Sequence, residues 1–202
     1  IRPLFPAGFY NEVVVTCHVL SSDGENDPDV LATIGASAAL HISDIPFDGP
    51  IGGARVGMID GEYILNPSYE EREESSLELF VVGVKNGIVM IEGEGKEAPE
   101  DQVVKGLEFA QEHIAPIIEA QEKFREQVGQ DKADVALFNP HPDLKGKVSE
   151  LSKDKLFKVY EIADKLERQN AASDLLDELL SDMSVYDAYK AEGEEEVPAA
   201  HI

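Results

Sequence analysis

The pattern of apolar residues changes once along this chain of 202 residues, and that change constrains the fold more than any short motif. Up to about residue 95, short apolar runs alternate with turn-forming pairs such as Asp60-Gly61 and Asn86-Gly87, which is typical of strands and hairpins. From Pro99 onward, apolar residues recur at steps of three and four, which is typical of amphipathic helices. The sequence therefore predicts an α+β fold in which a β/α core is followed by an all-helical part.

Individual elements follow from local patterns. The β-branched run at residues 12–20 predicts a buried strand with Cys17 inside it, and residues 30–42 predict a helix opened by Asp27-Pro28-Asp29. The small residues of that helix are expected to pack closely on a sheet. Two hairpins are predicted, 55–59 with 62–65 and 77–84 with 88–92. Pro116 is expected to kink or interrupt the following helix, residues 139–142 to form a linker, and residues 149–183 to form one or two helices.

Charge and composition exclude several classes of protein. The chain carries 41 acidic and 17 basic residues, a formal net charge of −24, which argues against a broad nucleic-acid-binding face and against DNA as a partner. The sequence shows no apolar run of about 18 residues and no basic region ahead of a short apolar stretch, so we expect no membrane association. One cysteine excludes an internal disulfide framework and fits a reducing cytoplasm.

Short motifs do not identify a reaction. The five histidines lack metal-ligand spacing, and the glycines of residues 49–53 are better explained by a turn than by a phosphate cradle. The carboxylates of residues 70–74 could bind a divalent cation, but a solvated loop or helical turn explains them more simply. Arg55 lies in an apolar strand, where a structural salt bridge is the favoured interpretation.

Three longer strings carry more information: IRPLFPAGFYNEV, ENDPDVLATIGASAAL and IPFDGPIGGARVGMIDGEYILNP. In this order and spacing they resemble the polynucleotide phosphorylases, in the first of that family's two RNase PH-like domains. The resemblance implies a phosphorolytic 3′-to-5′ exoribonuclease that degrades RNA to nucleoside diphosphates, with Mg²⁺ and phosphate as cofactors. It also implies an RNase PH-like core of the ribosomal protein S5 domain 2-like type, a homotrimer, a cytoplasmic location, and a role in mRNA degradation with possible degradation-complex partners.

The resemblance also predicts the organisation of the chain. Residues 1–95 correspond to the C-terminal part of the first RNase PH-like domain, 96–134 to a helical extension of it, and 135–202 to an incomplete all-helical linking domain. Because the chain starts without methionine, we expect it to be a segment of a longer polypeptide, which would contain the missing half-domain and a second RNase PH-like domain.

Carrying the family's active site over residue by residue predicts that this segment has no catalytic residue and no metal ligand. Residues 26–29 stand where the catalytic domain has a phosphate-binding Gly-Ser-Ser-Ser string, and Asn66 and Arg72 stand where it has two aspartates. Two aspartates repel phosphate, Pro28 lacks an N–H donor, and an arginine repels Mg²⁺. Mg²⁺ and phosphate are therefore expected outside this segment. Arg2 matches an arginine that lines the path to the active site in this family, so it is the one residue expected to contact RNA, with a surface ion pair as the alternative.

Two other functions remain open at this stage. The chain could be a stand-alone scaffold or adaptor that keeps the RNase PH-like fold without its chemistry. It could also be an independent metal-dependent enzyme that uses residues 70–74.

Overall fold

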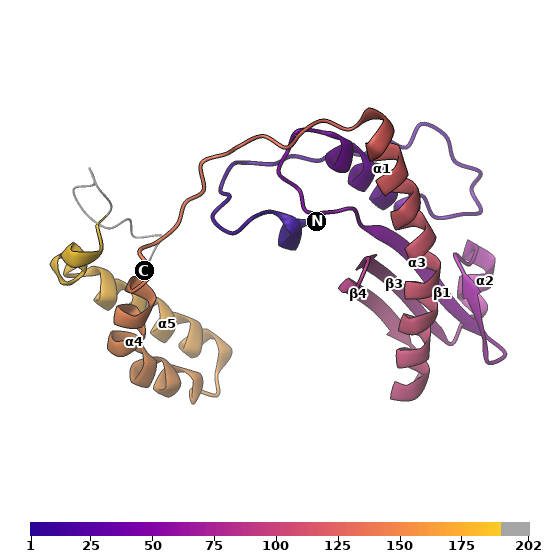
Figure 1. Ribbon diagram of the computed structural model, residues 1–202. Coiled ribbons are helices and arrows are strands. Elements are labelled where there is room, and N and C mark those ends of the chain that lie inside the picture. The colour runs from indigo at the N-terminus through magenta and orange to yellow at the C-terminus, as the bar shows by residue number, and fades with distance from the viewer. Residues whose placement is uncertain (191–202) are drawn as a thin grey trace. The chain divides into compact units, whose positions relative to one another are not determined.

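The computed structural model describes residues 1–190 (Figure 1). Two compact units follow one another along the chain, the first Ile1–Leu137 and the second from Phe138 onward, and each is described by itself. Within the described residues, no helix is both long and apolar enough to cross a membrane.

A four-stranded antiparallel sheet forms the centre of the first unit. Its strands are β1 (Gly52–Ile59), β2 (Glu62–Leu65), β3 (Leu77–Val84) and β4 (Gly87–Gly95), in the spatial order β2-β1-β3-β4. Both predicted hairpins are confirmed. The first closes through Asp60 and Gly61, whose φ angles of 51° and 84° are those of the tight turn that an Asp-Gly pair favours.

Helix α3 (Glu100–Val128) covers one face of this sheet (Figure 1). Its buried side chains pack on alternate residues of β1 and β3, and together they form the main core: Ala54, Val56, Met58, Leu77, Leu79, Val81, Ala110, Ile114 and Ile118. Of the kink or interruption predicted at Pro116, the interruption is wrong, because α3 continues through it as one element. Pro116 is exposed, so water can satisfy the carbonyl that loses its helical partner there, while Ile114 and Ile118 hold the helix to the sheet on both sides.

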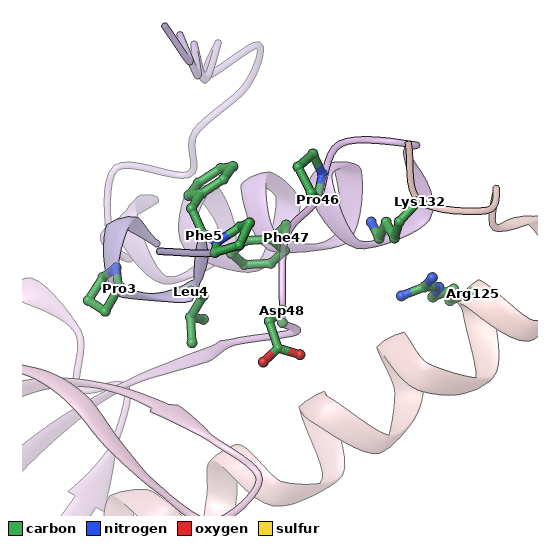
Figure 2. Close-up of a pocket in the computed structure, with 10 residues that line it drawn as sticks. Pro3, Leu4, Phe5, Pro46, Phe47, Asp48, Arg125 and Lys132 are labelled. Carbon is green, nitrogen blue, oxygen red and sulfur yellow. The ribbon is translucent and has the colours of Figure 1, made fainter. Parts of the chain in front are cut away.

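Helix α1 (Asp29–Ile42) packs on the opposite face of the sheet, against β1. Its buried residues are Val30, Ser37, Leu40 and His41. The small residues of α1 were expected to face the sheet, but Ala32, Gly35, Ala36 and Ala39 instead line a groove of about 520 Å³ that the coil at residues 15–21 borders. A one-turn helix, η1 (Arg2–Leu4), lies against the loop before β1, where Asp48 N donates to Leu4 O at 2.8 Å and the ring of Phe5 lies 5.8 Å from that of Phe47 (Figure 2).

The predicted strand at residues 12–20 is wrong. This segment forms no regular secondary structure, no strand in the described part of the chain pairs with it, and its side chains are largely exposed, including Val14 at 77% and Leu20 at 94%. The prediction that Cys17 is buried fails for the same reason, since its thiol is exposed and meets only Ala32 O, at 3.6 Å. A β-branched run becomes a strand only when a neighbouring strand takes up its backbone hydrogen bonds.

The second unit is helical over its described residues. It contains α4 (Leu144–Tyr160), α5 (Lys165–Leu180) and the 3₁₀ segment η2 (Met183–Tyr189). Its core is small: the fully buried side chains of Leu144 and Tyr186 pack with four partly buried neighbours. The predicted α+β fold, a mixed core followed by helices, is confirmed.

Candidate functional site

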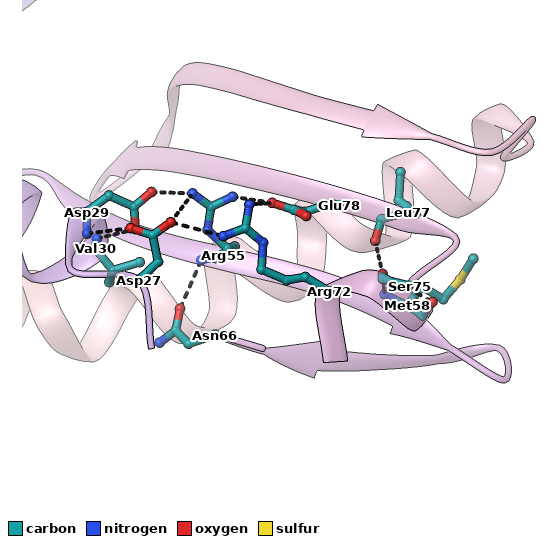
Figure 3. A network of polar contacts seen from close by, with 10 residues as sticks. All are labelled: Asp27, Asp29, Val30, Arg55, Met58, Asn66, Arg72, Ser75, Leu77 and Glu78. Carbon is teal, nitrogen blue, oxygen red and sulfur yellow. Dashed lines mark hydrogen bonds and ion pairs between the residues drawn. The ribbon is translucent and has the colours of Figure 1, made fainter. Parts of the chain in front are cut away.

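Five charged side chains converge on the face of the sheet opposite α3 (Figure 3). Asp27 and Asp29 come from the start of α1, and Arg72 comes from the short helix α2 (Tyr69–Glu74). Arg55 and Glu78 come from β1 and β3, where Arg55 pairs with Phe80 and Gly57 with Glu78, so their side chains emerge on the same face. We call these five residues the charged cluster.

Each arginine of the charged cluster joins carboxylates from separate elements. Arg55 donates from Nη2 to Asp29 and from Nη1 to Glu78, and its Nη2 lies 3.6 Å from Asp27 Oδ2. Arg72 donates from Nη1 to Asp27 at 3.0 Å and pairs through Nη2 with Glu78 Oε1 at 2.7 Å. The cluster therefore ties α1, β1, α2 and β3 to one another.

The cluster is shielded from solvent at its centre. The side chains of Arg55 and Glu78 are each only 13% exposed, and the Arg55 guanidinium lies 5.3 Å from the centroid of the Phe80 ring. The hydrogen bond to Glu78 raises the pKa of Arg72 above its usual value, with a further contribution from Asp27. Such shielded pairs are weakly screened by salt, and removing one partner leaves a charge in a poorly solvated place.

The start of α1 does not fit a phosphate ion. A helix N-terminus attracts anions through its free N–H groups, but here Asp29 N donates to Asp27 Oδ1 at 3.2 Å and Val30 N donates to Asp29 Oδ1 at 2.7 Å. Residue 28 is a proline, and the nearby guanidinium groups are already occupied by carboxylates. The chain's own carboxylates thus take the place that an external anion would need.

Asn66 and Arg72, the two positions that the sequence analysis aligned with the family's aspartates, do not fit a metal ion or a general acid. Asn66 Oδ1 accepts a hydrogen bond from Arg55 N at 2.9 Å, so the amide fixes the backbone of β1. Arg72 brings a positive charge to the other position. Among the described residues, no three His, Cys, Asp or Glu side chains are grouped so that they could hold a metal ion.

The acidic run at residues 70–74 forms α2, the helical turn that was one of its two simple interpretations. Ser68 and Glu71 make a capping box, in which the Glu71 carboxylate accepts from Ser68 N at 2.7 Å. This hydrogen bond lowers the pKa of Glu71 below its usual value. The run therefore acts in starting a helix, and Arg72 within it serves the charged cluster.

Sequence reasoning singled out four residues of the charged cluster separately, without predicting that they meet, and missed Glu78. The predicted structural salt bridge of Arg55 is confirmed. A single acidic residue in the apolar strand of residues 77–84, opposite another apolar strand with a single arginine, was the signal that could have identified Glu78. Arg2, the predicted RNA contact, lies exposed in η1, and its role stays a prediction.

Comparisons with known proteins identify the family to which this chain is similar. Residues 1–46 match the model of domain 1 of the 3′ exoribonuclease family, and residues 49–113 match its domain 2, so the two matches together span more than half of the chain. The chain is 43% identical over 185 residues to the polyribonucleotide nucleotidyltransferase of Sulfurihydrogenibium azorense, covering 92% of this chain and 26% of that protein. It is 44% identical over 197 residues to the one of Natranaerobius thermophilus, covering 97% and 27%.

The chain thus spans about a quarter of the length of the curated relatives it matches. The resemblance predicted from the three strings is confirmed, and with it the RNase PH-like character of the core. By its two matched domains and its relatives, this chain belongs to the 3′ exoribonuclease family.

Proposed function

We propose that this chain is a non-catalytic structural and RNA-channel portion of a phosphorolytic 3′-to-5′ exoribonuclease, which degrades RNA to nucleoside diphosphates. One observation carries this proposal: Asp27, which aligns with the family's phosphate-binding string, is ion-paired with Arg72, which aligns with one of the family's aspartates. Asp27 binds Arg72, and Asp29 binds Arg55. A carboxylate held by a guanidinium is a poor general base, and a guanidinium held by carboxylates is not free to bind phosphate.

The pocket beside the charged cluster also disfavours RNA. It has a volume of about 550 Å³, and Glu92 and Glu94 of β4 line it together with Asp29 and Glu78. Four carboxylates against two arginines repel a polyanion. On this proposal Mg²⁺, phosphate and the reacting RNA end bind elsewhere in the full-length enzyme, a cytoplasmic trimer acting in mRNA degradation.

A phosphorolysis assay tests the proposal. The chain is incubated with a short RNA, Mg²⁺ and inorganic phosphate, and nucleoside diphosphates are measured, with the full-length Aquifex aeolicus relative as positive control. We expect product from the relative alone. Nucleoside diphosphates from this chain would contradict the non-catalytic assignment.

A second assay uses the full-length protein that carries this segment. Arg72→Gln removes one arginine of the charged cluster, and we expect it to lower thermal stability while changing kcat/KM by less than about twofold below the unfolding temperature. A loss of kcat without a loss of stability would instead place Arg72 in the reaction.

A further inference from the structure

Two cations, Arg125 and Lys132, meet at a pocket that is separate from the charged cluster. The pocket has a volume of about 410 Å³ and is bordered by η1 and the loop before β1 (Figure 2). Arg125 comes from the last turn of α3, and Lys132 follows that helix. Figure 2 shows both side chains pointing toward the pocket. All of these segments belong to the first compact unit.

Lys132 is fixed in place by the end of α1. Its Nζ donates to Leu40 O at 2.9 Å, to His41 O at 3.1 Å and to Ser43 O at 2.8 Å, so it neutralises the negative end of that helix. Burial lowers the pKa of Lys132, and the nearby charge of Arg125 lowers it further. The positive charge of Lys132 is therefore already balanced by carbonyl dipoles.

Arg125 is in the opposite situation. In a chain with 41 acidic residues, its guanidinium makes no ion pair or hydrogen bond within residues 1–190, and it lies next to another cation. It is partly buried, between the pocket and a second hollow of about 410 Å³. His41 and the carboxylates of Glu122, Glu126 and Asp131 also line that hollow, but none of them makes an ion pair with Arg125 within the described residues. A partly buried guanidinium with five donors and no acceptor is a site that an external anion would satisfy.

The remaining wall of the pocket is apolar and partly aromatic. Phe5 and Phe47 contribute rings, and Pro3, Pro6 and Pro46 contribute flat apolar surfaces. Phe5 stacks on Phe9 with ring centroids 5.2 Å apart, which holds its orientation. Proteins bind single-stranded nucleic acids by stacking the bases on aromatic rings and by contacting the phosphates with nearby cations.

We propose that this pocket binds one nucleotide unit of single-stranded RNA, with Arg125 holding a phosphate and Phe5 supporting the adjacent base. The inference rests on the proposed function and adds a binding site to it. Arg2, the residue expected to contact RNA, immediately precedes Pro3 at the pocket wall, so a strand passing it would reach this site. Asp48 is the one carboxylate among the lining residues, and it pairs with neither cation within the described residues.

Binding of a fluorescent ten-nucleotide oligoadenylate to the chain, measured by anisotropy at several salt concentrations, tests the site. Arg125→Gln is expected to weaken binding about tenfold and to reduce the slope of log Kd against log salt by about 0.7, the value for one single-strand phosphate. Lys123→Gln is the matched control, because Lys123 is an exposed cation on the same helix outside the pocket. It should change affinity by less than twofold.

Two further variants separate the roles within the pocket. Phe5→Leu should weaken binding about fivefold or more without changing the salt slope, since it removes stacking and no charge. Asp48→Asn should tighten binding, because it removes the pocket's repulsive charge. Thermal unfolding of each variant verifies that it is folded at the assay temperature.

The outcomes distinguish the site from the proposed function. If the unaltered chain binds oligoadenylate but Arg125→Gln and Lys123→Gln behave alike, the pocket assignment is wrong and the RNA-channel role stands. If the unaltered chain does not bind oligoadenylate at all, both are wrong. If ADP binds with a dependence on Arg125 while oligoadenylate does not, the site takes a free nucleotide and the proposed strand contact is refuted.

Discussion

Replacing Glu78 by glutamine is the sharpest test of the charged cluster, because one oxygen of this side chain serves two arginines. Glu78 Oε1 pairs with Nη1 of Arg55 and with Nη2 of Arg72, and the side chain is 13% exposed. Hydrogen bonds to charged groups contribute about 1.5–3 kcal/mol each. The glutamine keeps one acceptor oxygen, and the loss of charge relieves repulsion from the two aspartates. We therefore expect a net loss of about 2 kcal/mol in the free energy of unfolding.

Differential scanning calorimetry measures this loss. For a unit of this size, about 2 kcal/mol lowers the unfolding temperature by about 6–10 °C. Glu122→Gln is the matched control, because Glu122 pairs with Lys85 at 3.6 Å while 39% exposed, and exposed pairs contribute less than about 1 kcal/mol. Equal decreases in the unfolding temperature of the two variants would refute the view that burial makes the ion pairs of the charged cluster contribute more to stability than an exposed pair. The difference between them should also persist at 0.5 M NaCl, since salt screens the exposed pair more strongly.

Three other predictions concern the pH dependence of stability, the close packing of the sheet and the core of the second unit. Burial, followed by the charge of Arg125, lowers the pKa of His41 below its ordinary 6.5. At His41 the unfolded chain therefore binds a proton more readily than the folded chain, and the free energy of unfolding should fall as the pH drops from about 6.5 to the lowered pKa of the folded state. If the free energy of unfolding of His41→Phe fell with pH to the same extent, the reasoning would be wrong. Gly93→Ala would place a Cβ 2.5 Å from a backbone oxygen of β3 and should cost about 1–3 kcal/mol in a denaturant titration, whereas Gly87→Ala meets nothing within 4 Å and should be near neutral. Leu144→Ala empties a fully buried position and should cost the second unit about 2–5 kcal/mol, seen as a loss of its amide-exchange protection while the first unit keeps its own; uniform loss would mean that the units unfold together.

Local sequence patterns predicted most of the elements. The Asp60-Gly61 pair located a hairpin because its two positive φ angles are a local requirement that few other residue pairs meet. The three- and four-residue spacing located α3 because one face of that helix packs on the sheet from Val103 to Ile118. In both cases the residues that form the pattern lie close to one another in the sequence.

The failures concern properties that depend on distant residues. Residues 12–20 have a strand-like composition, but a strand also needs a partner, and none lies beside them in the described chain. The charged cluster joins Asp27 to Arg72, 45 positions apart, and no local pattern shows that these two residues meet. Carrying the family's motif over predicted that the catalytic groups were replaced. It did not predict that the replacements bind each other.

The exposed course of residues 12–20 has a consequence for the integrity of the chain. Proteases bind their substrates as extended segments. Within the described residues, the backbone of residues 12–20 makes no hydrogen bond that a protease would have to break. A cut in this segment would break the covalent connection between η1 and α1. The fragment would still be held by the hydrogen bond from Asp48 to Leu4 and by the contact between Phe5 and Phe47. The first unit should therefore survive such a cut as a nicked but assembled particle, with both pieces migrating together until they are denatured.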